Sequence, residues 1–326
     1  MLRPTAALLA LPLAAVSLTA CGSDDAPPAP ARTAAAPVGA DRGRAHGYAV
    51  TQRDGLMLYS AKTREGRYRL IARRGTGPAR AAGPVDSQPF QVDLGTDAAG
   101  RDVAVYPRCE PGPCRLVVFD PATGRERTAA TAPRGRIRTA AIDRGIITYA
   151  LDVAGHRARI VAVPADGSGL ARTVLTTHAV VTALDTSSRG LTYVGVQPDV
   201  GAAHSSNTLY LRRRGRPSRV LARTGYGEEG GADIVSVSFS GRDLVWGVSG
   251  EDPNVYNYGE VHRLDLRTGR HTMLAVPNGG LISAAPDAAR AGGATLIAFQ
   301  NKADNDGFAP DEDDETLRRY AARDYR

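Results

Sequence analysis

Short β-rich segments recur along this chain at intervals of about 40 to 50 residues, and this period constrains the fold more than any other feature. Each segment combines aliphatic and aromatic residues behind a Gly, Asp or Ala, a composition typical of strands. No stretch carries sustained helical periodicity. Six segments show the pattern: residues 55–59, 102–106, 145–149, 190–194, 243–247 and 294–299.

A second strand-like segment follows most of these cores, and a turn follows the second strand. Two of the turns, at 120–124 and 265–269, share the pattern D-x-x-T-G. Asp opens such a turn by accepting backbone N–H groups, and Gly takes the positive φ that closes it. The second segments are residues 68–71, 115–119, 159–163, 208–211 and 261–264.

Short strands separated by Gly, Asp and Pro fit either a β-sandwich or a β-propeller. The fixed period favours the propeller, in which each four-stranded blade buries its faces against two neighbours. We therefore predict an all-β fold, a β-propeller of about six four-stranded blades over residues 45–326. Residues 316–320 are expected to form a late strand, and a strand from 47–50 to complete the last blade, because an open ring leaves unpaired edges. Seven blades, or five with an irregular N-terminus, stay open.

One blade carries a resemblance to a known family. Residues 100–106, read together with 116–125, resemble the repeat of TolB-like (WD40-like) β-propellers. The likeness extends over residues 45–326, although the family's Ser-Pro-Asp-Gly turn is absent. What the resemblance implies is the propeller fold; it says little about partners.

The N-terminus has the three parts of an export signal. Arg3 supplies positive charge, residues 5–20 are apolar apart from hydroxyls, and Ala20-Cys21 forms a cleavage junction. The apolar run spans roughly 24 Å as a helix, short of a bilayer core of about 30 Å, so cleavage is favoured over a retained span. The end of this run, residues 18–22, resembles the lipobox of bacterial lipoproteins, in which the cysteine is acylated and becomes the new N-terminus. An ordinary secretory signal is the alternative.

These features divide the chain into a lipoprotein signal peptide (1–20), a Pro/Ala-rich tether (21–44) and the propeller (45–326). Cys21 is the predicted lipidation site, with palmitate-type acyl chains as the membrane anchor. The tether holds almost nothing large enough to bury, so we expect it to be disordered and extended. The predicted location is the extracytoplasmic face of the cell membrane.

Basic residues outnumber acidic ones, and the net charge is +7. Only Lys62 and Lys302 among the 41 basic residues are lysine. This bias, with abundant Ala and Gly, indicates a GC-rich coding sequence rather than a nucleic-acid surface. The densest basic run, residues 212–219, lies between two strand-like segments and is expected to be an exposed hairpin tip. No nucleic-acid partner is predicted.

The remaining cysteines, Cys109 and Cys114, enclose four residues rich in Pro and Gly. A metal site needs more ligands, and a redox pair is usually separated by two residues at the start of a helix. A disulfide that staples a hairpin is therefore predicted, in agreement with an oxidising compartment.

Candidate chemistry is sparse, and no catalytic residue is predicted. Residues 225–230 match G-x-G-x-x-G, but a strand-like segment follows them where a dinucleotide site needs a helix, so a loop between blades is expected. His262 and His271 can meet across one hairpin, but two ligands do not make a metal site. Asp143, Asp185 and Asp287 recur near the turn from first to second strand. Turn capping is favoured for them over acid–base work in a central channel.

The sharpest acidic cluster gives weak candidates for a Ca²⁺ site. Oxygen-rich loops with a Gly turn suit this cation, but on an EF-hand template with Gly307 at position six, position one becomes Lys302. A solvated acidic loop is therefore favoured, and no cofactor is predicted. The Ca²⁺ candidates are Asp304, Asp306, Asp311 and Asp313.

Together these features predict a lipid-anchored binding or scaffold protein at the cell envelope, whose partner is an envelope protein or a small ligand. The alternative is an envelope enzyme on the same fold: a hydrolase, a lyase or a quinone-cofactor dehydrogenase. The fold alone does not decide between them. Converging carboxylates, His or Arg in the channel favour the enzyme, and a channel filled by Ala, Val and Thr favours the scaffold.

Overall fold

The computed structural model describes ten stretches of the chain, all within the compact unit Ala35–Arg326. Among these residues no helix has the length and apolar character needed to cross a membrane. The described stretches are 45–63, 65–75, 77–109, 112–198, 205–227, 230–252, 255–276, 281–286, 296–301 and 315–320.

Twenty of the described strands form five antiparallel blades of four strands, each with its strands in chain order. Blade 1 holds β1 (Ala45–Arg53), β2 (Leu56–Lys62), β3 (Tyr68–Arg74) and β4 (Arg80–Asp86). Blade 2 holds β5 (Asp93–Thr96), β6 (Asp102–Arg108), β7 (Cys114–Asp120) and β8 (Arg125–Ala132). Blade 3 holds β9 (Ile137–Asp143), β10 (Ile146–Val153), β11 (Arg157–Pro164) and β12 (Arg172–Thr177).

Blades 4 and 5 are continuous with each other. Blade 4 holds β13 (Val180–Ser187), β14 (Gly190–Pro198), β15 (Ser205–Arg212) and β16 (Ser218–Gly227). Blade 5 holds β17 (Gly230–Ser240), β18 (Asp243–Asp252), β19 (Val255–Asp265) and β20 (His271–Val276). A short pairing of β16 with β17 merges them into one eight-stranded sheet. The C-terminal sheet holds β21 (Leu281–Pro286), β22 (Leu296–Asn301) and β23 (Glu315–Tyr320).

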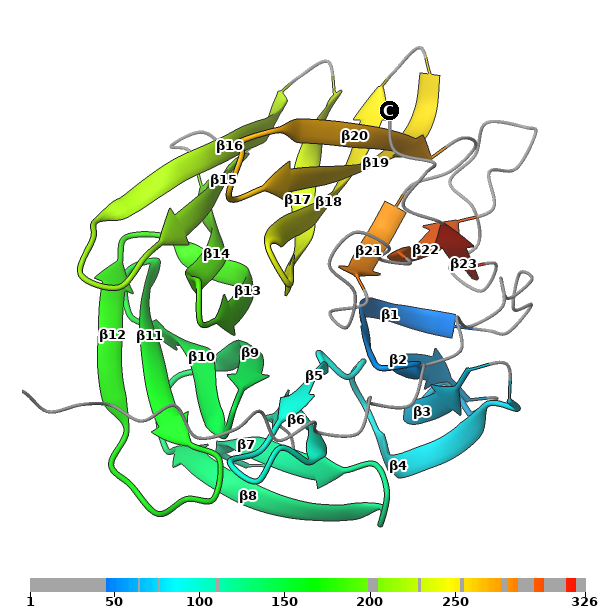
Figure 1. Cartoon of the computed structure of the whole chain (residues 1–326), viewed down its shortest axis with the longest axis vertical. Coiled ribbons are helices and arrows are strands. Elements are labelled where there is room, and N and C mark those ends of the chain that lie inside the picture. The colour runs from blue at the N-terminus through cyan, green and yellow to red at the C-terminus, as the bar shows by residue number, and fades with distance from the viewer. Residues whose placement is uncertain are drawn as a thin grey trace, which may run out of the picture. The chain divides into compact units, whose positions relative to one another are not determined.

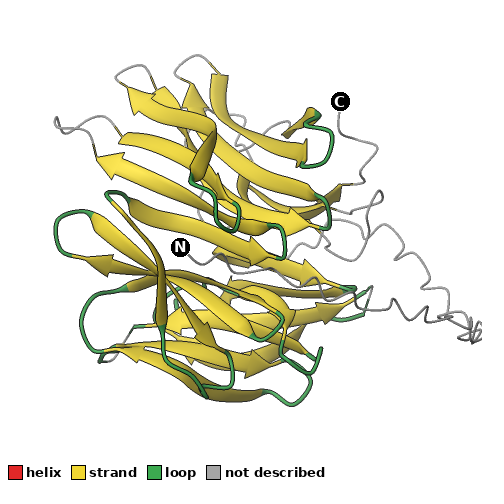
Figure 2. Ribbon diagram, turned by 60° about the vertical axis from the view of Figure 1, so that its left-hand side comes forward, coloured by secondary structure: helices red, strands yellow, loops and turns green. Residues whose placement is uncertain are grey.

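The sheets are arranged around a common centre, with the first strand of each sheet innermost (Figure 1). Each innermost strand contacts the next, and the innermost strand of the C-terminal sheet, β21, contacts β1. The described part of the chain is drawn as strands and loops throughout (Figure 2). This arrangement confirms the predicted propeller.

The hydrophobic core lies between consecutive blades. One cluster joins Leu58 and Leu70 of blade 1 to Tyr106 and Phe119 of blade 2. Equivalent clusters join blade 2 to blade 3, blade 3 to blade 4 and blade 4 to blade 5. Because side chains alternate across a strand, each central strand can contribute one row of apolar residues to each neighbouring blade. This two-sided burial explains why the sequence cores of blades 1 to 5 read as nearly continuous apolar runs.

Among the described residues the number of four-stranded blades is five, so the prediction of about six was wrong. All six cores form the second strand of a sheet, but the sixth lies in the three-stranded C-terminal sheet. β1 was expected to complete that sheet and instead begins blade 1. Asp54 and Gly55 have φ values of 48° and 78° and form a two-residue hairpin turn that pairs Arg53 with Leu56. This turn commits β1 to β2.

The two predicted D-x-x-T-G turns and the predicted disulfide are confirmed. Asp120 Oδ1 accepts the N–H of Ala122 at 2.8 Å, and Gly124 has a φ of 71°. Asp265 and Gly269 repeat this geometry. Cys109 and Cys114 form a disulfide across the β6–β7 hairpin.

Two further loop predictions agree with the structure. The basic run lies at the β15–β16 turn, where residues 213–217 are exposed. The G-x-G-x-x-G segment spans the link between β16 and β17, so it leads into a strand and joins two blades.

Candidate functional site

A cavity of about 290 Å³ lies among the innermost strands β1, β5, β9, β13 and β17. It reaches the turns that join the first strand to the second in blades 3, 4 and 5, where Arg144, Ser187 and Gly241 line it. Its polar lining is mostly hydroxyls, together with three carboxylates, Asp93, Asp143 and Asp185. Polar groups gathered in a concave site are the usual mark of a binding site.

Two of the cavity carboxylates, Asp93 and Asp185, accept backbone N–H groups of the next blade. Asp93 Oδ2 on β5 accepts the N–H of Ile142 on β9 at 2.8 Å. Asp185 Oδ2 on β13 accepts the N–H of Phe239 on β17 at 2.5 Å. Thr51 Oγ1 on β1 does the same for Leu94 on β5, at 3.0 Å. We call Thr51, Asp93 and Asp185 the seam acceptors, because each joins two blades.

Blade 3 departs from this pattern. The N–H groups that the preceding blade accepts belong to Leu94 in blade 2 and to Ile142 in blade 3. Asp93 precedes Leu94 and Ala141 precedes Ile142, so Ala141 occupies in blade 3 the position that Asp93 has in blade 2. The methyl group of Ala141 cannot accept a hydrogen bond. The N–H of Thr186, which follows Asp185, is instead accepted by the Oδ1 of Asp185 at 2.6 Å. The two oxygens of Asp185 therefore serve two blades, which ties this residue to the structure of the channel.

The approach of β5 to β9 is close. A Cβ at Gly95 would run into the carbonyl oxygen of Ile142. Glycine is needed there because the backbones of two blades meet without room for a side chain. Gly95 and the hydrogen bond of Asp93 therefore both stabilise the contact between β5 of blade 2 and β9 of blade 3.

Loss of solvation raises the pKa of Asp93 and of Asp185. It raises the pKa of Asp93 to about 6, against the hydrogen bonds from Ile142 and Leu94, which lower it. Burial also raises the pKa of Asp185 well above its usual value, and the charge of Asp93 adds to this increase. Two carboxylates that disfavour each other's ionisation can hold a proton near neutral pH.

The sequence did not place these groups correctly. Asp185 was predicted to cap a turn, but it lies within β13, paired with Thr192, and faces the channel. Asp143 does end β9 beside a turn, where it accepts the Arg144 guanidinium at 3.2 Å. Asp287 lies outside the described residues. Asp93 was not singled out, although a charged residue between Val92 and Leu94 is a signal of a buried polar role.

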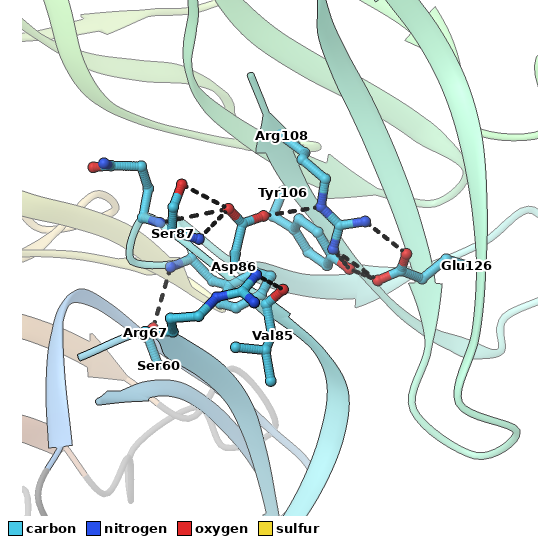
Figure 3. A network of polar contacts seen from close by, with 10 residues as sticks. Ser60, Arg67, Val85, Asp86, Ser87, Tyr106, Arg108 and Glu126 are labelled. Carbon is cyan, nitrogen blue, oxygen red and sulfur yellow. Dashed lines mark hydrogen bonds and ion pairs between the residues drawn. The ribbon is translucent and has the colours of Figure 1, made fainter. Parts of the chain in front are cut away.

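A second pocket, of about 810 Å³, lies between blades 2 and 3 beside the disulfide, and Asp86, Arg108 and Ile137 are among its lining residues. At its edge Arg108 joins blade 1 to blade 2 (Figure 3). Arg108 Nε donates to Asp86 Oδ2 at 3.0 Å, and its two terminal nitrogens donate to Glu126 at 2.9 and 3.1 Å. The two-pronged contact suits the planar guanidinium.

Tyr106 completes this network. Its hydroxyl donates to Glu126 Oε1, and its ring lies 5.5 Å from the Arg108 guanidinium carbon. Burial, and then the bond to Glu126, raises the pKa of Tyr106. Asp86 also accepts the N–H of Ser87 at 2.7 Å. Only 14% of the Arg108 side chain and 14% of the Asp86 side chain are exposed, so this is a largely buried ion pair.

The described residues contain no group of three or more His, Cys, Asp or Glu side chains that could hold a metal. His262 and His271 do meet across the β19–β20 hairpin, with His262 Nδ1 3.1 Å from His271 Nε2. Burial lowers the pKa of His262, against the bond to Glu260, which raises it.

Several predicted sites lie outside the described residues. These are the signal peptide, Cys21, the tether and the Ca²⁺ candidates Asp304, Asp306, Asp311 and Asp313. Their roles stay predictions.

No protein-family model matches the chain, and no curated protein matches it. Solved structures do. A chain of the nidogen/laminin complex is 15% identical, with a TM-score of 0.52, over 76% of this chain and 89% of that one. TolB from Acinetobacter baumannii is 11% identical, with a TM-score of 0.52, over 82% of this chain and 64% of that one.

An oligogalacturonate lyase from Vibrio parahaemolyticus is 11% identical over 86% of this chain and 76% of that one. Its TM-score is 0.47, too low to bear on chemistry. At such identities the likenesses establish the fold alone. The chain therefore has an all-β propeller fold of the kind that TolB has.

Proposed function

We propose that this protein is a lipid-anchored binding or scaffold protein of the cell envelope, and that its partner contacts the mouth of the central cavity. The observation that carries the binding role is the use of Asp93 and Asp185, the two cavity carboxylates with a raised pKa, as seam acceptors. A carboxylate that accepts a backbone N–H group of the neighbouring blade has a structural role, because it joins the two blades. Recognition then falls to loops and side chains at the mouth, such as Arg144.

A protein partner is favoured over a small ligand. The similar propeller chain from the nidogen/laminin complex belongs, by that description, to a protein–protein assembly. The rim of a propeller offers loops from several blades at once, which suits a broad contact. The cavity itself, at about 290 Å³, is at the small end for a site that encloses a ligand.

An envelope enzyme is the second candidate, and one observation favours it. A carboxyl group with a pKa of about 6, such as Asp93, is suited to general acid–base catalysis near neutral pH. If the chain is a hydrolase, lyase or quinone-cofactor dehydrogenase, Asp93→Asn should abolish turnover. If it is a binding protein, this variant should keep its partners.

The test of the binding role is a comparison of captures from native membranes. Arg144 is exposed at the mouth of the cavity, whereas Arg159 is exposed on β11 of the same blade and does not line the cavity. Arg144→Ser is expected to reduce the recovery of partners, with a stronger effect at low salt because charge steers association. Arg159→Ser is the matched control and should recover the wild-type set. Identical recovery with all three proteins would refute binding at the mouth.

The anchor is tested separately. Cys21→Ala is expected to move the protein from the membrane to the soluble fraction, because acyl chains contribute about 0.8 kcal/mol per buried CH₂. Fractionation and mass spectrometry of the mature N-terminus measure this. A wild-type protein recovered without lipid in the soluble fraction contradicts the anchor and leaves the binding role standing.

A further inference from the structure

The second, third and fourth strands of blade 5 bring together a tryptophan, two histidines, a methionine and a glutamate on one face. Trp246 on β18 pairs directly with His262 on β19, and His262 pairs directly with Met273 on β20. His271 precedes Met273 by two residues, and Glu260 precedes His262 by two. Because side chains alternate across a strand, all five project from the same face of the sheet.

The two imidazoles face each other. His262 Nδ1 lies 3.1 Å from His271 Nε2, and the two ring planes differ by 8°. A metal ion about 2.0 Å from both nitrogens would form an N–metal–N angle of about 100°, between the square-planar and tetrahedral values. His271 is exposed, so its ring can turn within the plane of its stack on Trp246 to direct Nε2 at such an ion.

The other nitrogen of His262 is held by a carboxylate. His262 Nε2 lies 2.9 Å from Glu260 Oε2. This contact places the proton on Nε2 and leaves the lone pair of Nδ1 directed toward His271. A carboxylate behind a histidine orients the ring and raises its basicity, and it is the usual outer partner of a metal-binding imidazole.

Trp246 fixes the floor of this cluster. It is 4% exposed, and its ring centroid lies 5.0 Å from that of His262 and 5.3 Å from that of His271, with nearly parallel planes. A rigid aromatic surface limits the orientations of both imidazoles, which lowers the entropy cost of binding an ion.

We propose that His262, His271 and Met273 form a mononuclear copper site, with Glu260 orienting His262. Two imidazoles bind copper, nickel or zinc, and among divalent ions the affinity order favours copper. The thioether of Met273 is a soft ligand that selects Cu⁺. Met273 lies directly opposite His262 in the β19–β20 pairing and is 38% exposed, so an ion from solution can approach the cluster from its side.

The chain carries its own reporter for this site. Trp246 is the only tryptophan of the chain, so fluorescence excited selectively at tryptophan comes from the ring on which the two histidines stack. One equivalent of Cu²⁺ is expected to quench most of this emission. His271→Gln should abolish this effect, and because His271 is exposed, the variant should fold. His178→Gln, at another exposed histidine, is the matched control and should be quenched like the wild type.

Two variants separate the roles of the remaining residues. Glu260→Gln is expected to weaken Cu²⁺ binding about 10- to 100-fold, the usual effect of removing an outer partner. Met273→Leu preserves volume and should weaken Cu⁺ binding, measured by competition with a Cu⁺ chelator, more than it weakens Cu²⁺ binding. Equal quenching of the wild type and His271→Gln, or no quenching of the wild type, would overturn the proposal. Equal Cu⁺ affinity of the wild type and Met273→Leu would remove Met273 from the site.

Discussion

Replacement of Arg108 by methionine is expected to lower the free energy of unfolding by about 3 kcal/mol. Arg108 is the only cation that contacts both Asp86 and Glu126 among the described residues, and all three side chains are at most 25% exposed. Methionine keeps most of the buried volume but leaves two carboxylates without their counter-charge. The loss should lie at the low end for a buried pair, because Asp86 keeps the Ser87 N–H and Glu126 keeps the Tyr106 hydroxyl.

Urea denaturation followed through Trp246 measures this loss. Arg138→Met is the matched control, because Arg138 also pairs with an aspartate, Asp152, from a side chain that is 37% exposed. An exposed pair contributes about 0–1 kcal/mol, so this control should unfold near the wild type. Equal losses in both variants would show that the Arg108 network does not join blades 1 and 2 in the way its geometry indicates.

The second large effect concerns the pH dependence of stability at Asp93. Relative to Asp93→Asn, the wild type is expected to gain about 1.4 kcal/mol of unfolding free energy between about pH 7.5 and pH 5. The pKa of Asp93 is raised in the folded protein, from 3.8 to about 6, so folding favours its protonated form. Its contribution is complete below the unfolded pKa and is lost as pH rises through the folded pKa. The relevant window is therefore about pH 4 to 6.

Apart from Asp185, whose pKa the charge of Asp93 raises, the other titrating groups cancel in this comparison. The pKa of His262 is lowered on folding, so its contribution falls as the pH falls, but it is present in both proteins. Asp120 and Asp265 have lowered pKa values and lose their contributions only below the window. Asp143→Asn is the matched control, because Asp143 also lines the cavity but is 31% exposed. It should follow the wild-type profile, and an Asp93→Asn profile parallel to the wild type would contradict the raised pKa.

The same pair predicts a reciprocal effect. Asp93→Asn removes a charge that raises the pKa of Asp185, so the pKa of Asp185 should fall toward its usual value. The variant keeps one acceptor oxygen for the Ile142 N–H, which limits the structural loss.

Local chemistry was enough to determine the strands and their turns. The six cores and the D-x-x-T-G turns could be predicted because an apolar run, an Asp cap and a Gly of positive φ act within a few residues. The Cys109–Cys114 disulfide belongs to the same class, since a short Pro/Gly loop between two strands leaves few other partners. The period of the cores then made a propeller the fold that buries both faces of each sheet.

Only the tertiary structure decided which polar residues meet. Asp93 and Asp185 lie more than 90 residues apart, and each finds its backbone N–H on a different blade, so no local pattern marks them as seam acceptors. The two-residue turn at Asp54 and Gly55 determined the place of β1, whereas ring closure alone predicted that β1 would complete the last blade. His262 and His271 could be placed on one hairpin from the sequence, but Trp246 and Met273 join them through strand register. Register depends on packing against the neighbouring blade, since a shift of one residue would turn each of these side chains to the other face.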